Sequence, residues 1–440
     1  MSIASLNYPI HRHQLANGLR LNLSPDPWTP VVAVNLWYDV GSAHEPPGRW
    51  GFAHLFEHLM FSGSAHVAPG EHLGQLQALG GEVNATTSFD RTNYFETVPQ
   101  GAAELALWFE AERLGGLLQA IDQATLDSER EVVKEEKRQR YDNLPYGEAF
   151  DQLVQLAFGP DHPYGHLPIG SMADLDAASL ADVRAFFNTY YRPDNAVLSL
   201  TGAIERDRAI GWAEDYFGDL PPSTSRPAPP SAFPPTPQPT PGALTLAALP
   251  PLTGQPRTEL VRDVPRAAVY CAWRTPAATD PEHDAIDLVL SILADGLAAR
   301  LHQALVRSGL AHAVAASGLG LARGNSLAVV QATVQEGVEP AAVEQRLLDG
   351  WQDFLDQGPT TAELERAVAQ AARDWLSALA NLETRADALS EASLTHDDPG
   401  RINTWLSQLA QLTAADLRRA ANQWLDPGQR ATLVYRREAR

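Results

Sequence analysis

The most constraining feature of the chain is a proline-rich stretch near its middle. Residues 221–241 contain ten prolines among 21 positions. Proline fixes its own φ angle and cannot donate a backbone hydrogen bond, so such a stretch favours extended polyproline conformations and cannot join a helix or a central strand. It therefore predicts a linker that divides the 440 residues into two globular parts. We expect domains at 1–220 and 257–440, joined by a linker at 221–256.

The two parts repeat one pattern of residues, which indicates an internal duplication. Three residues of the first part recur at a constant offset of 234 positions: Asp182, Asn188 and Pro193 return as Asp416, Asn422 and Pro427. In both copies a helix leads through a proline turn into an apolar strand. The pattern predicts that both parts share one architecture.

Local patterns predict individual elements. Alternation around an Asn-Gly turn predicts a hairpin, β-branched and aromatic runs predict strands, and 3.6-residue periodicity predicts helices. The predicted elements are a hairpin over 11–24, strands over 31–38, within 83–99 and over 269–273, and helices over 73–79, 101–121, 123–142 and 284–294.

Residues 51–64 contain a motif that indicates chemistry. His54 and His58 are four positions apart, and Glu57 directly precedes the second histidine. On a helix these three positions share a face, so both imidazoles can point at one object. A catalytic zinc ion takes such nitrogen ligands and keeps one position for water, which a nearby carboxylate can deprotonate. The order His-x-x-Glu-His is the inverted zincin pattern. The alternative is a polar patch on an amphipathic helix.

A second charged helix can complete this site. Glu129 and Glu136 are seven positions apart, so they share a face over two helical turns. Two histidines do not make a full ligand set, and a carboxylate from another helix could supply the third ligand. A run of Glu, Arg and Lys is also typical of a solvated helix surface, and the spacing alone does not choose between these interpretations.

The composition limits the partners and the compartment. The formal net charge is −21, whereas nucleic acids and anionic membranes bind clustered Lys and Arg, so we expect neither as a partner. The single cysteine, Cys271, excludes an intramolecular disulfide and a cysteine zinc cage. We find neither a signal-peptide pattern nor an apolar run of the ~18 residues that would span a membrane. These observations predict a cytoplasmic globular protein.

Together the motifs resemble those of the inverzincin zinc peptidases of the pitrilysin, insulin-degrading and mitochondrial-processing type. The resemblance covers nearly the whole chain and includes His54-x-x-Glu57-His58, Gly80-Gly81-x-x-Asn84-Ala85-x-Thr87-x-x-Asp90-x-Thr92-x-Tyr94, Glu129 to Glu136, Pro163-Tyr164-Gly165-His166 and the Arg300-Leu301 region. A chain of this length with one duplicated unit resembles the short bacterial subfamily. The resemblance implies an α+β fold of two homologous domains, each a mainly antiparallel sheet flanked by helices.

Carried over to this chain, the family pattern assigns roles to five residues of the two helices. His54, His58 and Glu136 become the ligands of one Zn²⁺ per chain, and Glu57 becomes the general base. Glu129 becomes a carboxylate that orients a histidine ligand and raises its basicity.

The family pattern also assigns the peptide site. Asn84 and Ala85 would lie on an edge strand that receives an extended peptide by strand addition. Tyr94 would help to hold the oxyanion or the active-site strand, and packing between strands is the alternative for this side chain.

The second half departs from the family pattern. Active members resemble one another in an Arg and a Tyr, seven apart, from a segment close to Arg-x-x-x-Gly-Leu-x-Tyr. Here Leu305 and His312 occupy these two positions, and Arg307 fits only after a register shift. The departure implies a zinc-bearing subunit whose sister chain supplies the pair. A homodimer, or Arg307 and His312 acting in altered form, is the alternative.

We therefore expect a zinc-dependent metalloendopeptidase that cleaves short or unfolded peptides through a metal-activated water, as the catalytic subunit of a heterodimer. The alternative from another class is a catalytically silent scaffold or a peptide-binding subunit of a larger complex.

Overall fold

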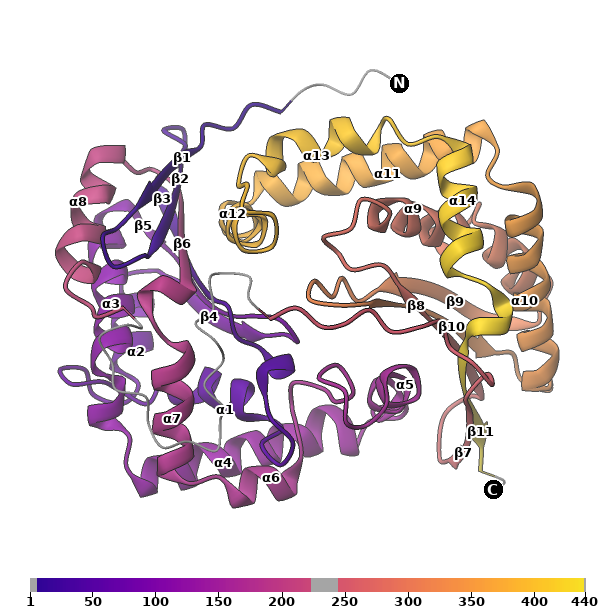
Figure 1. Cartoon of the computed structure of the whole chain (residues 1–440), viewed down its shortest axis with the longest axis horizontal. Coiled ribbons are helices and arrows are strands. Elements are labelled where there is room, and N and C mark those ends of the chain that lie inside the picture. The colour runs from indigo at the N-terminus through magenta and orange to yellow at the C-terminus, as the bar shows by residue number, and fades with distance from the viewer. Residues whose placement is uncertain (1–5, 223–243, 439–440) are drawn as a thin grey trace.

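The computed structural model describes residues 6–222 and 244–438 and contains two β-sheets, one from each half of the chain (Figure 1). Neighbouring strands are mostly antiparallel, and helices flank both sheets, which confirms the expected α+β class. Residues 223–243, which hold most of the expected linker, lie outside the described residues, and the expected domain boundaries stay a prediction.

The first sheet has six strands in the order β1-β2-β6-β3-β5-β4, and among these neighbours β2 and β6 are the parallel pair. Its centre is apolar: β3, with the sequence Val-Val-Ala-Val-Asn-Leu-Trp-Tyr, is almost entirely buried. The strands are β1 (His11–Gln14), β2 (Arg20–Pro25), β3 (Val31–Tyr38), β4 (Glu82–Thr87), β5 (Thr92–Pro99) and β6 (Ala196–Gly202). The helices of this half are α1 (Phe52–Leu59), α2 (Glu71–Ala78), α3 (Ala103–Ala120), α4 (Gln123–Lys137), α5 (Ala149–Phe158), α6 (Met172–Ala177), α7 (Leu180–Tyr190) and α8 (Arg206–Phe217).

The second sheet has five strands in the order β7-β11-β8-β10-β9. Its strands are β7 (Arg257–Arg262), β8 (Ala268–Thr275), β9 (Ala311–Gly318), β10 (Ser326–Val334) and β11 (Ala431–Arg437). The helices of this half of the chain are α9 (His283–Ala294), α10 (Pro340–Gln357), α11 (Thr361–Ala380), α12 (Leu382–His396), α13 (Arg401–Leu409) and α14 (Ala414–Trp424). None of the helices in the described part of the chain is both long and apolar enough to cross a membrane.

The two halves repeat one architecture, as the sequence pattern predicts. Without β1, the first sheet has the same strand order as the second, and in each sheet the first two of these strands are parallel. The offset of 234 positions carries α7 onto α14 residue for residue. Both helices begin with a capping box, built by Ser179 and Asp182 in one half and by Thr413 and Asp416 in the other.

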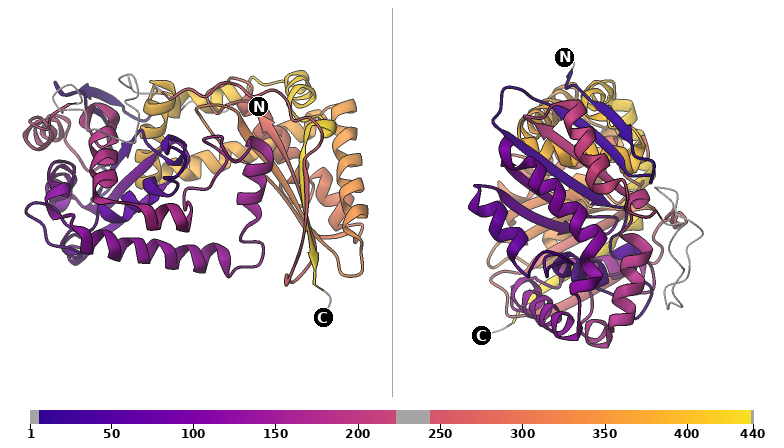
Figure 2. Two further views of the ribbon diagram at one scale, coloured as in Figure 1. Left: turned by 60° about the horizontal axis from the view of Figure 1, so that its bottom comes forward. Right: turned by 90° about the vertical axis from the view of Figure 1, so that its left-hand side faces the viewer.

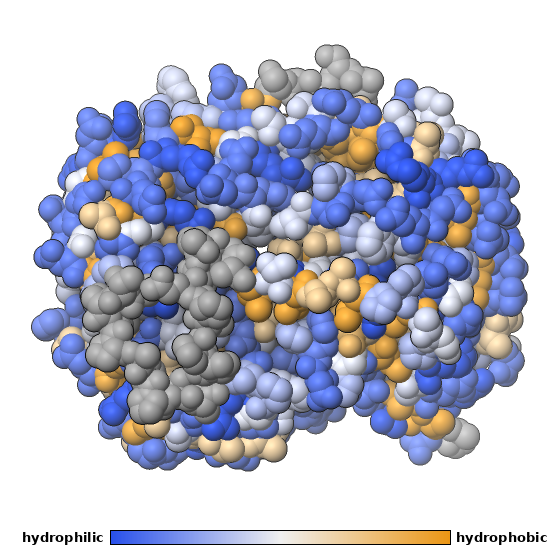
Figure 3. All heavy atoms as spheres, viewed as in Figure 1, coloured by the Kyte–Doolittle hydropathy of each residue, from blue (hydrophilic) through white to orange (hydrophobic). Residues whose placement is uncertain are grey.

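The halves are joined because each contributes a helix to the sheet of the other. α12 packs on β3 and β6 of the first sheet, whereas α5 packs on β8 and β11 of the second. The same offset places α5 within α12, so the exchange is reciprocal. Figure 2 shows the two halves from other directions, and Figure 3 shows the surface hollowed near its centre, between the halves.

A buried polar network ties the loop between β9 and β10 to the first half. The backbone N–H of Ala322 donates to Asp90 Oδ2 at 2.7 Å, and the Tyr164 hydroxyl donates to Asp90 Oδ1 at 2.7 Å. The Arg323 guanidinium forms a buried ion pair with Asp39. Since Asp90 lies in the turn between β4 and β5, this network holds the edge of the first sheet against the second half.

Candidate metal centre

Helix α1 turns its polar face away from the core, because its apolar residues occupy the positions that face the core. Phe52, Leu55, Phe56 and Leu59 are fully buried, which leaves the three polar residues of the motif on the opposite face. Gly51 begins the helix with φ of 102°, a left-handed conformation that favours glycine.

The first turn of α1 is anchored by a carboxylate that the sequence motif does not include. Glu45 is fully buried as a side chain and accepts the backbone N–H of Gly51 at 2.8 Å and of Ala53 at 2.7 Å. His166 Nε2 lies 3.0 Å from Glu45 Oε2. Because the first backbone N–H groups of a helix have no partner within the helix, this carboxylate fixes where α1 begins.

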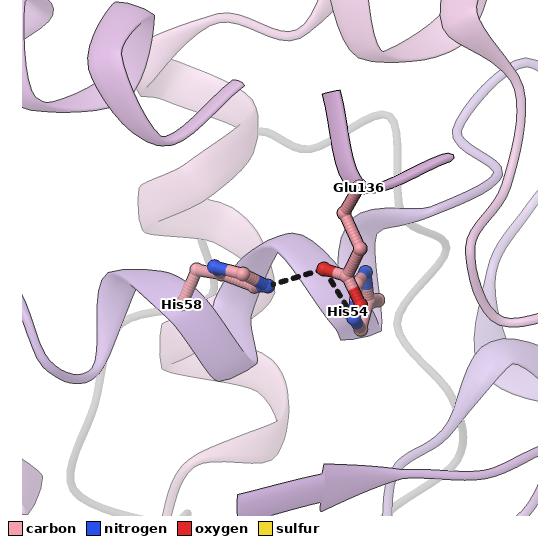
Figure 4. Close-up of side chains that lie close together, drawn as sticks. All are labelled: His54, His58 and Glu136. Carbon is pink, nitrogen blue, oxygen red and sulfur yellow. Dashed lines mark ion pairs between the residues drawn. The ribbon is translucent and has the colours of Figure 1, made fainter. Parts of the chain in front are cut away.

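The structure brings the two histidines of α1 together with Glu136 of α4 (Figure 4). Glu136 Oε2 lies 3.2 Å from His58 Nε2 and 3.7 Å from His54 Nε2. One ligand atom from each of the three residues lies within 4.8 Å of the others. Their side chains are 22%, 11% and 16% exposed for His58, His54 and Glu136, so water can reach them.

Two of the three side chains, His54 and Glu136, are held in the charge state that a divalent cation requires. Burial lowers the pKa of His54 to about 4, so this imidazole is neutral and can act as a ligand near neutral pH. Burial also lowers the pKa of His58, but the hydrogen bond and the charge of Glu136 outweigh burial and raise it. The hydrogen bond from His58 lowers the pKa of Glu136, which keeps that carboxylate ionised. Two imidazoles and one carboxylate form a ligand set of a catalytic zinc site.

Two further charged residues contact this cluster. Glu129 Oε2 lies 3.8 Å from His58 Nδ1, which is longer than a hydrogen bond, and Ser62 donates to Glu129 Oε1 at 2.9 Å. Arg140 Nη1 lies 2.6 Å from Glu136 Oε1, on the side away from His58. Glu129 thus lies on the Nδ1 side of the His58 imidazole, away from Glu136, and its orienting role stays a prediction.

Glu57 lies next to this cluster on α1, and its carboxylate is held by the edge strand β4. The Thr87 hydroxyl donates to Glu57 Oε2 at 2.6 Å. Burial raises the pKa of Glu57, which brings it closer to the range in which a carboxyl can both take and give a proton. Thr87 belongs to the strand motif quoted above, but no pattern in the sequence indicates that its side chain reaches Glu57.

The residues expected to contact a peptide separate into two groups. Asn84 and Ala85 lie on β4, which is an edge strand. Tyr94 instead is fully buried on β5, and its hydroxyl lies 3.4 Å from the Phe56 carbonyl and 3.0 Å from the Tyr191 hydroxyl. Its burial and its contact with the Phe56 carbonyl of α1 favour the packing alternative, and the expected role of Tyr94 in holding the oxyanion or the active-site strand stays a prediction.

A second group of potential ligands in the described residues is better explained as a buried ion cluster. His72, Glu96 and Glu110 lie close together and are buried. Arg113 donates to Glu110 through Nε at 2.9 Å and lies 3.5 Å from Glu96 Oε1. The guanidinium already supplies the cation of this group, which leaves the α1–α4 cluster as the candidate metal centre.

The positions of the expected Arg and Tyr lie in the second half. Leu305 is buried, whereas Arg307 and His312 are exposed. Whether Arg307 and His312 replace the pair, or a sister chain supplies it, stays a prediction.

Comparison with known proteins shows that both halves of the chain are similar to peptidase family M16. Residues 20–162 match the family model described as "Insulinase (Peptidase family M16)", and residues 177–371 match "Peptidase M16 inactive domain". The chain is 28% identical over 434 residues to "Zinc protease PqqE" of Helicobacter pylori, covering 96% of this chain and 91% of that protein. It is 28% identical over 215 residues to the mitochondrial-processing peptidase subunit beta of Saccharomyces cerevisiae, covering 48% of this chain and 45% of that protein.

A solved structure shares the fold over its full length. The crystal structure of a protease from Helicobacter pylori matches with a TM-score of 0.87 and 26% identity, covering 98% of this chain and 99% of that chain. The two sheets, their helices and the α1–α4 cluster thus define a pitrilysin-like two-domain protein. The chain belongs to peptidase family M16, in the short form that its bacterial relatives share, and the expected resemblance is confirmed.

Proposed function

We propose that this chain is a zinc-dependent metallopeptidase that cleaves short or unfolded peptides. The observation that carries the proposal is the convergence of His54, His58 and Glu136 from two helices, with the Glu57 carboxylate on the same face of α1. These three side chains would hold one Zn²⁺. The ion would supply Lewis-acid chemistry, lowering the pKa of a water molecule and polarising a peptide carbonyl.

Glu57 moves the proton in this proposal. Thr87 binds Oε2, so Oε1 is the oxygen that accepts a proton from the attacking water. The same carboxyl then donates that proton to the nitrogen of the leaving amine as the peptide C–N bond breaks. The raised pKa of Glu57, caused by burial, supports this two-way transfer.

The open edge of β4 is the peptide site in this proposal. An added strand bonds to the main chain, so recognition depends on an extended backbone more than on particular side chains. Folded proteins do not offer such a segment, which explains the preference for short or unfolded peptides. Asn84 and Ala85 lie on this edge.

We also propose that the active form is a heterodimer in which a sister chain supplies the missing Arg and Tyr. The support is Leu305, which is buried where the family pattern has arginine, and the match of residues 177–371 to an inactive domain. Copurification from the native source tests this, and full activity of the isolated chain would overturn it.

The expected cytoplasmic location is part of the proposal, and recovery from the envelope or the medium would contradict it.

The Glu57→Gln variant tests the proposed reaction. We expect the variant to bind zinc like the wild type and to lose cleavage by about 10²- to 10⁴-fold, because the general base is removed while the ligands remain. Glu135→Gln is the matched control, since Glu135 is exposed on α4 and pairs with Arg138 and Gln139. Zinc content and cleavage of an unstructured fluorogenic peptide are measured together. Peptide binding without products from the wild type would instead favour the scaffold or peptide-binding alternative.

A further inference from the structure

The last residue of β4 connects the edge strand to the general base. Thr87 Oγ1 donates a hydrogen bond to Glu57 Oε2 at 2.6 Å. Among the described residues, Thr87 is the side chain that donates to the Glu57 carboxylate. A carboxylate on a helix can rotate about several bonds, so one short bond from a rigid strand decides where its second oxygen points.

The backbone N–H and C=O of Thr87 face the open edge of the sheet, roughly at right angles to its side chain. The Ser88 N–H bonds to the Arg91 carbonyl at 2.8 Å, so these two residues form a hydrogen-bonded pair at the end of the β4–β5 hairpin. Bonded and non-bonded pairs alternate in an antiparallel ladder, and Thr87 opposite Thr92 is therefore a non-bonded pair. Since β4 is an edge strand, the N–H and C=O of Thr87 point away from the sheet.

Thr87 offers a donor on this edge that Ala85 does not. Ala85 is also in a non-bonded pair, opposite Tyr94, but its N–H already donates to Asn84 Oδ1 at 2.9 Å. A peptide that adds to β4 thus meets the backbone of Thr87, while the side chain of the same residue holds Glu57.

We propose that Thr87 is a positioning residue that sets the orientation of Glu57 and couples it to the strand on which the peptide docks. The inference rests on the proposed peptidase function. Docking on the β4 edge stiffens the backbone of Thr87, and the Oγ1–Oε2 bond transmits that fixed position to the base. Outer partners of this kind affect rate by about 10- to 100-fold when removed.

Variants at positions 86 and 87 test the proposal. We expect Thr87→Val to lower kcat by about 10- to 100-fold with KM within about threefold and zinc content unchanged, because the hydroxyl is lost and the backbone remains. Thr87→Ser keeps the hydroxyl and should restore kcat to within about threefold. Thr86→Val is the matched control: Thr86 lies on the other face of β4 and bonds to Asn93 and Arg91.

A double variant separates positioning from a structural role. If Thr87 acts through Glu57, adding Thr87→Val to Glu57→Gln should cost nothing further, since the two changes remove one function. The inference would be overturned if Thr87→Val lowered the kcat of Glu57→Gln by the same factor as it lowers the kcat of the wild type. It would also be overturned if Thr87→Val alone kept the wild-type kcat. Thr87→Ala serves if the valine variant fails to fold. Absence of any Glu57-dependent cleavage by the wild type would overturn the proposed function and this inference together, whereas wild-type cleavage with an inert Thr87 overturns the inference alone.

Discussion

Glu136 Oε2 lies 3.2 Å from Nε2 of His58, although the two residues come from separate helices, α4 and α1. The contact depends on the packing of these helices, which meet directly in the first half. Two histidines on one helical turn are a common pattern. With the carboxylate of Glu136, they provide three possible metal ligands around one point. The candidate metal centre is therefore a property of helix packing as much as of the motif.

Removing the charge of Glu136 should weaken zinc binding most. We expect Glu136→Gln to lower zinc affinity by more than about 100-fold, beyond the range seen when outer partners of a ligand are changed. Competition with a chromophoric chelator measures the affinity, and Glu135→Gln, one position earlier on the exposed side of α4, should bind like the wild type. Equal affinity in Glu136→Gln would remove this residue from the ligand set.

Glu129 should have a smaller effect, because it faces the outer nitrogen of His58. We expect Glu129→Gln to lower zinc affinity by about 10- to 100-fold, since the carboxylate 3.8 Å from Nδ1 orients the imidazole without holding the ion. The same chelator competition applies. Glu131→Gln is the control, as Glu131 is exposed and pairs with Lys134. A loss as large as that of Glu136→Gln would make Glu129 a direct ligand.

His44 should make the metal-free protein less stable in acid. Burial lowers its pKa to about 4, and its Nδ1 accepts the Gly41 N–H at 3.1 Å, so the folded protein keeps it neutral. The unfolded chain takes up a proton below about pH 6.5, so the stability that this histidine provides is present above that pH and is lost as the pH falls toward 4.

The size of this effect follows from the two pKa values. Between pH 7 and pH 5 the histidine should account for about 2 kcal/mol of lost unfolding free energy. Urea unfolding of the wild type and of His44→Asn, whose Oδ1 can replace Nδ1 as acceptor, measures the difference. Parallel pH profiles for the two proteins would show that His44 is protonated in the folded state.

The ion pair between Arg323 and Asp39 should be costly to break, because it joins the halves and both side chains are buried, at 6% and 3% exposure. Arg323→Met leaves a buried carboxylate without this partner, and we expect a loss of about 3–5 kcal/mol in the unfolding free energy. Arg12→Met is the control: the Arg12–Asp397 pair is 52% and 82% exposed, and its loss should cost less than about 1 kcal/mol. Equal losses of unfolding free energy in Arg323→Met and Arg12→Met would show that burial does not determine the cost of breaking an ion pair in this protein.

Local patterns were sufficient for most elements of the first half. The strand expected over 31–38 is β3 with the same bounds, and the hairpin expected over 11–24 is β1 and β2. These segments could be predicted because alternation and turn chemistry act between neighbours in sequence. The exchange of α5 and α12 between the halves could not be predicted, since an amphipathic helix has the same pattern whichever sheet it covers.

By itself, the sequence determined the duplicated α+β architecture, the paired histidines of α1 and the family to which the chain belongs. Tertiary structure decided which glutamate meets those histidines, that Tyr94 is buried beneath α1, and that Thr87 holds Glu57. The reason is one of range: periodicity reports which face of an element is apolar, whereas a site made from two helices and a strand edge depends on how their faces pack.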